Sequence, residues 1–211
     1  MLDIRPIKAK LREHYKALRR EMPRDKKMLL DQRITRLITG LWQYKRCGLL
    51  LTYVSTALEV DTAELIRHAL ADNKRVAVPR CVDGTYLMKF YYIKSPDDLA
   101  PGSFGVPEPD PNRCRPVTDF SNSLCLVPAL CYDWKGYRLG YGKGYYDRFL
   151  ADYTGIMVGA AYSSCIRRRL PHGKFDRPVG LLVTESYIRR TDHPAQFQSE
   201  QLNRDRQKAK G

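Results

Sequence analysis

The chain lacks any hydrophobic run long enough to cross a membrane. Its longest apolar stretch, around residues 48–51, is the size of a strand, well below the roughly 18 apolar residues of a membrane helix. The opening residues, MLDIRPIKAK, lack the apolar segment of a secretion signal, so we expect a cytoplasmic protein. No internal repeat is visible. With 43% hydrophobic and 28% charged residues among 211, the composition excludes a disordered chain and a coiled-coil rod.

The cysteines and histidines show no metal-binding spacing. None of the six cysteines forms a C-x-x-C pair, and the four histidines are too scattered to complete a zinc pattern. In a chain of this size without a signal segment, we expect reduced and mostly buried thiols rather than disulfides or a catalytic cysteine.

Negative charge is scarce at both ends of the chain. The net charge is +14, and residues 1–46 hold 14 lysines and arginines against five acidic residues, whereas residues 47–186 hold 17 against 15. A chain with basic ends and a nearly neutral body suits three kinds of partner, namely nucleic acid, an anionic membrane face or a polyanionic small molecule. Charge alone leaves these alternatives open.

The first 45 residues predict two helices. Over residues 5–22, apolar side chains recur at spacings of three and four, and a basic stripe runs beside them: Lys8, Arg12, Lys16 and Arg19. Pro23 ends this helix, because the residue before a proline is disfavoured in the helical region. A second helix is expected over residues 25–45.

The rest of the chain alternates predicted strands and helices. Strands are expected at residues 48–54, 75–79, 86–93, 124–128, 155–161 and 180–184, and helices at 61–73 and 144–151. Such alternation, with short continuously apolar strands, predicts a three-layer α/β/α fold around a largely parallel sheet. The proline- and glycine-rich residues 95–117 are expected to form a loop or lid.

These elements make one domain. We expect it to cover residues 1–189, with N-terminal helices at 5–45 and an α/β core at 47–186. The polar, basic residues 190–211 lack apolar periodicity, and we expect them to be a mobile tail.

One motif, residues 138–147 (RLGYGKGYYD), points to chemistry. Three alternating glycines precede a predicted helix, whose free N–H groups and dipole favour an anion such as phosphate. Arg138 and Lys143 add positive charge, and Asp147 is placed to hold a Mg²⁺ that bridges phosphates. The spacing matches neither G-x-x-x-x-G-K-[ST] nor G-x-G-x-x-G, so a P-loop NTPase and a conventional dinucleotide fold are disfavoured. A plain glycine turn that caps a helix remains the alternative.

Beyond its spacing, the run from Leu126 to Leu150 resembles the signature of the 5-formyltetrahydrofolate cyclo-ligase family, also called 5,10-methenyltetrahydrofolate synthetases. Further segments also resemble this family: KAKLR at 8–12, Tyr53 with EVDT at 59–62, VPR at 78–80, GVPEP at 105–109, and LP with VTE at 170–185. The resemblance spans about residues 6–186. It implies a Rossmann-like fold of the NagB/RpiA/CoA-transferase-like group.

The resemblance also implies an activity. Family members use MgATP to convert 5-formyltetrahydrofolate to 5,10-methenyltetrahydrofolate, with release of ADP and phosphate through a phosphorylated formyl intermediate. Such chemistry depends on positioning and charge neutralisation rather than on a protein nucleophile.

Carried over by position, the resemblance assigns site residues. Catalytic roles are implied for Arg138, Lys143 and Tyr146. ATP binding is implied for Lys8, Arg12, Arg138, Leu139, Gly140, Tyr141, Gly142, Lys143, Gly144, Tyr145 and Tyr146. Folate binding is implied for Arg12, Val54, Glu59, Phe104, Tyr141 and Tyr145, and Mg²⁺ coordination for Asp147 and Asp176. Phe104 stands where many members carry tryptophan, and Phe175 stands before Asp176 where histidine or asparagine is common.

Three other readings stay open. They are a basic nucleic-acid-binding protein, an ATP-dependent enzyme for another small substrate, and a folate-binding protein without turnover. The leading reading implies small-molecule partners, no membrane, no specific nucleic acid and a monomer.

Overall fold

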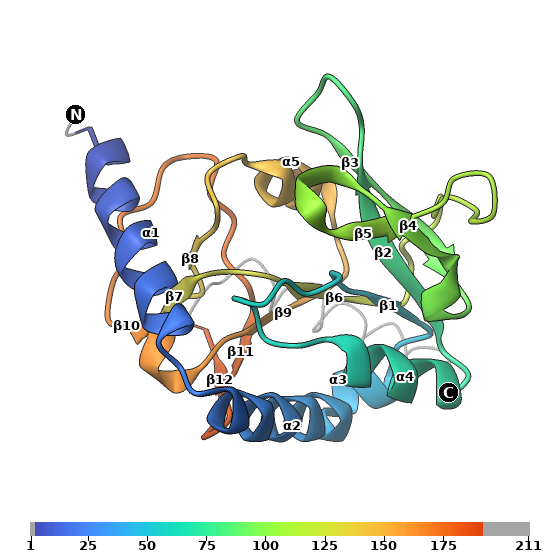
Figure 1. The fold of residues 1–211 in the computed structure, drawn as a ribbon, viewed down its shortest axis with the longest axis horizontal. Coiled ribbons are helices and arrows are strands. Elements are labelled where there is room, and N and C mark those ends of the chain that lie inside the picture. Colours follow the sequence, from blue (N-terminus) through green and yellow to red (C-terminus); the bar gives the residue numbers. More distant parts are fainter. Residues whose placement is uncertain (1–2, 192–211) are drawn as a thin grey trace, which may run out of the picture.

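A seven-stranded sheet forms the centre of the protein (Figure 1). The computed structural model describes residues 3–191, without the side chain of Phe104. The strand order is β12-β11-β9-β6-β1-β2-β3. These strands are β1 (Leu49–Leu51), β2 (Arg75–Cys81), β3 (Met88–Ile93), β6 (Ser123–Val127), β9 (Ile156–Ala160), β11 (Leu181–Val183) and β12 (Ile188–Arg190).

The middle of this sheet is parallel, as the sequence predicts. Strands β11, β9, β6, β1 and β2 pair in parallel, and only β3 and β12 run antiparallel at the two edges. All residues of β1 and β6 are buried, because helices and loops cover both faces. Parallel strands place their carboxyl ends at one edge of the sheet, where the loops that form the site begin.

Helices cover both faces of the sheet, so the three-layer α/β/α expectation is confirmed. Figure 1 shows α2 (Arg24–Gly40), α3 (Trp42–Arg46) and α4 (Ala63–Ala71) on one face and α5 (Tyr145–Asp152) on the other. Helix α1 (Arg5–Arg20) stands at one end, where it packs against β8 (Arg138–Leu139).

Within residues 3–191, two small sheets and three short 3₁₀ helices complete the fold. Strands β4 (Leu99–Pro101) and β5 (Pro107–Pro109) pair with each other, and β10 (Ile166–Arg167), β7 (Cys131–Asp133) and β8 form a three-stranded sheet. The 3₁₀ helices are η1 (Pro96–Asp98), η2 (Ser103–Gly105) and η3 (Ser163–Cys165). The expected loop at 95–117 is therefore partly regular, and its β5 packs against β2.

Two predicted elements have different bounds in the structure. The helix expected at 25–45 breaks at Leu41, whose extended backbone (φ −60°, ψ 135°) separates α2 from α3. The strand expected at 48–54 covers only β1, because after Leu51 the chain leaves the sheet to form a wall of the site. Tyr53 stays buried there through its hydroxyl, which donates to the Val60 carbonyl at 3.0 Å.

The predicted basic stripe of α1 is not uniform. Lys8 and Arg12 face the site, Lys16 pairs with Glu13 at 2.9 Å, and Arg19 is only 4% exposed. The spacing correctly predicted one helix face, but it could not show that the last member enters the core. The neighbouring apolar stripe is also shorter than expected, since Ile7 is 42% exposed.

The folded domain extends beyond the expected boundary at residue 189. Strand β12 includes Arg190, and Thr191 is 2% exposed. The Thr191 hydroxyl donates to the Val179 carbonyl at 2.6 Å, and its N–H donates to the Gly180 carbonyl at 3.0 Å. The mostly polar residues of β12 gave no strand signal in the sequence, because an antiparallel strand at the edge of a sheet needs little apolar periodicity. The rest of the expected tail, 192–211, lies outside the described residues.

The expectation of mostly buried thiols is confirmed. All six cysteines are free; five are buried and Cys81 is partly exposed. A search of residues 3–191 found no helix that is both long enough and apolar enough to span a membrane.

The Thr191 contacts predict a measurable contribution to stability. We expect Thr191→Val to lower the free energy of unfolding by about 1 kcal/mol, because the buried Val179 carbonyl loses its side-chain donor. Urea unfolding measures this change. Thr39→Val is the control, since the Thr39 hydroxyl bonds an exposed helix carbonyl. Equal effects of the two substitutions would show that Thr191 has no anchoring role.

Candidate functional site

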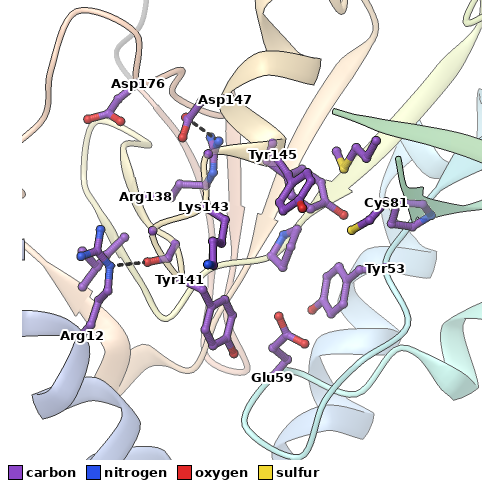
Figure 2. Close-up of a pocket in the computed structure, with 18 of the residues that line it drawn as sticks. Arg12, Tyr53, Glu59, Cys81, Arg138, Tyr141, Lys143, Tyr145, Asp147 and Asp176 are labelled. Atoms are coloured by element: carbon purple, nitrogen blue, oxygen red, sulfur yellow. Dashed lines mark hydrogen bonds and ion pairs between the residues drawn. The ribbon is translucent and has the colours of Figure 1, made fainter. Parts of the chain in front are cut away.

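A cavity of about 710 Å³ lies between α1, the loop that joins β8 to α5, the segment after β1, and the β2–β3–β5 wall. It brings together nearly every residue named from the sequence, although these are far apart in the chain. Figure 2 shows side chains from these walls pointing into one space. The predicted residues that line it are Lys8, Arg12, Val54, Glu59, all of 138–147, and Asp176.

The glycine-rich loop has the backbone conformation that its sequence predicts. Gly144 is the N-cap of α5 with φ +75°, and Gly142 has φ +101°, a region that favours glycine. A Cβ atom on Gly142 would lie 3.2 Å from the Arg12 guanidinium carbon. The loop therefore needs glycine at Gly142 both for its conformation and for the close approach of Arg12.

Cations from α1 reach this loop and its surroundings. The Arg12 Nε donates to the Gly140 carbonyl at 2.9 Å, a contact visible in Figure 2. Lys8 Nζ lies 2.6 Å from a carboxylate oxygen of Asp176, which also accepts the Gly173 N–H at 2.7 Å. Helix α1 thus brings positive charge to the loop from a distant part of the sequence.

Arg138 and Asp147 form an ion pair across the loop. Arg138 Nη2 lies 2.6 Å from Asp147 Oδ1, and Nη1 donates to the Arg177 carbonyl at 2.8 Å. The Arg138 side chain is only 5% exposed, whereas that of Asp147 is 29% exposed. The pair joins β8 to the first turn of α5 and to the segment around residue 177.

The two acidic residues expected to hold a metal both line the cavity. In residues 3–191, no group of three or more histidine, cysteine or acidic side chains is arranged to hold a metal ion. Two carboxylates at one cavity fit Mg²⁺, which is usually bound by one or two carboxylates together with phosphate oxygens and water. They do not fit a structural zinc.

The opposite wall presents Glu59. Its Oε2 accepts hydrogen bonds from the Thr56 N–H at 2.8 Å and the Thr56 hydroxyl at 2.9 Å. Glu59 is 6% exposed, and Figure 2 shows its carboxylate facing Tyr141. Burial, and next the Glu59 carboxylate, raise the pKa of Tyr141 to about 12. Tyr141 is therefore a protonated donor beside the acid, and Val54 lies half-buried on the same wall.

Two further tyrosines stand at the start of α5. The Tyr145 hydroxyl donates to the Thr85 carbonyl at 3.3 Å, which joins the loop to the β2–β3 hairpin. The Tyr146 hydroxyl is buried without a hydrogen-bond partner in the described part of the chain. Burial raises the pKa of Tyr146, so this orphaned group is a protonated donor next to the cavity.

Sequence reasoning missed one wall of the cavity. Cys81 and Met88 line it from β2 and β3, and Glu108 lines it from β5. Glu108 is 5% exposed, accepts the Cys81 N–H at 3.2 Å and lies 3.7 Å from Arg80. Burial and the Glu108 carboxylate raise the pKa of the Cys81 thiol, which disfavours it as a nucleophile. The GVPEP turn was a signal for this region but did not single out Glu108.

One named residue is not placed. Phe104 lies in η2, next to Ser103, which lines the cavity, but its side chain lies outside the described part of the structure. Its expected contact with folate stays a prediction.

Comparisons with known proteins place the chain in a family. The model of the 5-formyltetrahydrofolate cyclo-ligase family matches residues 5–185, and this protein therefore belongs to that family. A probable 5-formyltetrahydrofolate cyclo-ligase of Schizosaccharomyces pombe is 32% identical, over 74% of this chain and 83% of the relative. The enzyme of Haemophilus influenzae is 30% identical, over 71% and 82%.

Solved structures agree with this membership. The structure of Aquifex aeolicus 5,10-methenyltetrahydrofolate synthetase superposes with a TM-score of 0.79 at 32% identity, and covers 89% of this chain and 94% of its own. A Mycoplasma pneumoniae synthetase shares the fold, with a TM-score of 0.64 at 22% identity over 84% and 98%.

The geometry of the glycine loop predicts a difference between two of its glycines. Gly142→Ala should lower the free energy of unfolding by about 1–3 kcal/mol, because alanine is strained at that φ and its methyl group would press on Arg12. Gly140→Ala should cost less, since no atom lies within 4 Å of its Cβ position. Urea unfolding compares the two. Similar losses would contradict the described loop conformation.

Proposed function

We propose that this protein converts 5-formyltetrahydrofolate to 5,10-methenyltetrahydrofolate with consumption of MgATP and release of ADP and phosphate. The observation that carries the proposal is a single cavity with a cation-lined glycine loop on one wall and a carboxylate on the other. Family membership supports the same reaction.

The glycine loop and α1 would bind the ATP phosphates. Backbone N–H groups at the start of α5 and the dipole of that helix favour anions, and Lys8, Arg12 and Lys143 add charge around them. Lys8 is paired with Asp176. When phosphate binds, Lys8 would exchange part of its contact with Asp176 for contacts with phosphate oxygens, so that its ammonium group still faces an anion.

The wall that carries Glu59 would bind the folate. A carboxylate can accept paired hydrogen bonds from the amino and ring N–H groups of a pterin. Thr56 already fixes the orientation of the Glu59 carboxylate, so the acid is held ready before the ligand arrives. Val54 and the neighbouring tyrosines offer apolar and aromatic surface to the ring.

The proposed chemistry needs no protein nucleophile. The formyl oxygen attacks the γ-phosphorus, and the bond from that phosphorus to ADP breaks. The folate N10 then attacks the formyl carbon, phosphate leaves with the former formyl oxygen, and N10 loses its proton. Arg138, Lys143 and Tyr146 are our candidates for stabilising the charge that moves onto oxygen during these steps. The unpartnered Tyr146 hydroxyl supports its role as a donor to substrate.

Asp147 and Asp176 would hold the Mg²⁺. The ion would neutralise phosphate charge and orient the γ-phosphate. Both carboxylates line the cavity beside the glycine loop, which supports this role. One oxygen of each carboxylate is paired with a cation, Asp147 with Arg138 and Asp176 with Lys8, so the ion would bind the second oxygen of each.

The proposal disfavours the other readings. Of the four cations in the predicted stripe, Lys8 and Arg12 line the cavity, Arg19 is buried and Lys16 pairs with Glu13, so they do not form one open stripe for nucleic acid. Two readings remain, an enzyme for another small substrate and a folate-binding protein without turnover. An assay with 5-formyltetrahydrofolate distinguishes both from the proposal. A monomeric state and a cytoplasmic location stay predictions; one relative, from Arabidopsis thaliana, is named as mitochondrial.

The experiment is a direct assay. Purified protein is mixed with 5-formyltetrahydrofolate, ATP and Mg²⁺, and the near-ultraviolet absorbance of methenyltetrahydrofolate is followed, since the substrate does not absorb there. We expect absorbance that needs all three components. If the protein binds folate without giving this absorbance, only the reading without turnover is left. If it gives neither folate binding nor absorbance, the proposal is refuted.

Two residues of α1 separate specific phosphate binding from general attraction. Arg12→Ala should raise the KM for ATP roughly tenfold, because Arg12 lines the cavity and contacts the glycine loop. Lys16→Ala is the control, since Lys16 pairs with Glu13 instead. Steady-state kinetics at two salt concentrations measure both. Equal, salt-dependent losses would contradict a specific role for Arg12.

A further inference from the structure

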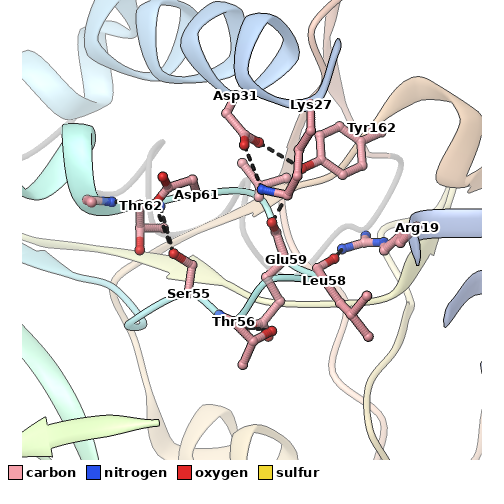
Figure 3. Close-up of polar contacts among 12 residues, drawn as sticks. Arg19, Lys27, Asp31, Ser55, Thr56, Leu58, Glu59, Asp61, Thr62 and Tyr162 are labelled. Atoms are coloured by element: carbon pink, nitrogen blue, oxygen red, sulfur yellow. Dashed lines mark hydrogen bonds and ion pairs between the residues drawn. The ribbon is translucent and has the colours of Figure 1, made fainter. Parts of the chain in front are cut away.

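The segment that carries Glu59 is anchored from behind by buried polar groups (Figure 3). Arg19 Nη1, from α1, donates to the Leu58 carbonyl at 2.6 Å. The Tyr162 hydroxyl, which follows β9, lies 3.3 Å from the Glu59 carbonyl oxygen. Arg19 therefore holds the carbonyl before Glu59. The carbonyl of Glu59 itself is the second and more distant acceptor of the single Tyr162 O–H, whose nearer acceptor is Asp31 at 2.8 Å. Neither Arg19 nor Tyr162 lines the cavity.

Arg19 also holds the opposite wall. Its Nη2 donates to the carbonyls of Ala129 and Leu130, at 2.8 and 2.9 Å, just before β7 and β8 lead into the glycine loop. The planar fork of a guanidinium can serve carbonyls of two chain segments at once, which the single ammonium of lysine does less well. One buried side chain thus links the Glu59 wall to the strand that leads to the phosphate wall.

Tyr162 supports this arrangement. The Arg19 guanidinium carbon lies 5.3 Å from the centre of the Tyr162 ring, within the range of a cation–π contact. Burial and the neighbouring Asp31 raise the pKa of Tyr162, so its hydroxyl stays a donor and bonds Asp31 at 2.8 Å. Lys27 pairs with the other oxygen of Asp31 at 2.7 Å, which keeps that acid in place.

We infer that Arg19 and Tyr162 are positioning residues that set the direction of the Glu59 carboxylate toward folate. The inference rests on the proposed function. Neither residue touches the ligand; both act through the backbone at Leu58 and Glu59. A small displacement of an orienting group is costly because binding groups need accurate placement. The wall proposed to bind ATP is held by other contacts, namely the ion pair between Lys8 and Asp176 and the hydrogen bond from Arg12 to the Gly140 carbonyl.

The chain offers a matched control with the same chemistry between α3 and the end of α4. The Tyr44 hydroxyl donates to Asp72 at 2.9 Å, as Tyr162 does to Asp31. Lys74 lies over the Tyr44 ring at 4.9 Å and donates to the Cys47 carbonyl at 2.9 Å, as Arg19 does with its ring and carbonyls. Neither Tyr44 nor Lys74 lines the cavity.

The test compares Arg19→Lys and Tyr162→Phe with Lys74→Met and Tyr44→Phe, in the full chain. Thermal unfolding and the KM values for 5-formyltetrahydrofolate and ATP are measured for each. We expect Arg19→Lys to raise the folate KM roughly tenfold, and Tyr162→Phe to raise it less, while the ATP KM changes by less than about twofold. The controls should lose stability with both KM values unchanged.

The outcomes separate the two proposals. An inactive wild-type protein refutes the proposed function. An active wild type with an unchanged folate KM in Tyr162→Phe and Arg19→Lys refutes the positioning role, as does an equal rise in the ATP KM. If Arg19→Lys does not fold, Tyr162→Phe decides alone, because it removes only a hydroxyl.

Discussion

The ion pair between Arg138 and Asp147 is the contact on which the site depends. It joins the end of β8 to the first turn of α5, and Arg138 also holds the segment around Arg177. The glycine loop lies between these fixed ends. The flanking elements are fixed in place, and they stabilise the positive φ of Gly142. Arg12 then packs against this glycine.

Around this pair, the parallel sheet supplies the geometry. Strands β1, β2 and β6 are buried neighbours, so the loops that follow them meet at one edge. Helix α1 comes from outside this pattern and adds Lys8 and Arg12 to the cavity. The last turn of the same helix carries Arg19, whose contacts with backbone carbonyls link the two walls. One helix therefore supplies both ligand-facing and wall-holding cations.

Sequence could predict the central strands and the glycine loop, because apolar runs and alternating glycines are local signals. It did not predict β12, in which two of the three residues are arginines, or the break at Leu41, where the backbone becomes extended. In the site, residues within motifs were found, whereas Glu108 and Cys81 were not, since their place on the wall comes from the packing of β5 against β2. Arg19 could not be predicted for a similar reason. Helical spacing predicts which face of α1 carries Arg19, but only its tertiary contacts show that this side chain is buried.

The step on which the proposed function depends most is the transfer of the γ-phosphoryl group of ATP to the formyl oxygen. Substrate labelled with ¹⁸O in the formyl group tests this directly. After complete turnover with ATP and Mg²⁺, the account predicts that the label appears in the released phosphate, one labelled oxygen for each methenyltetrahydrofolate formed. Unlabelled phosphate, with the ¹⁸O found in water instead, would contradict it.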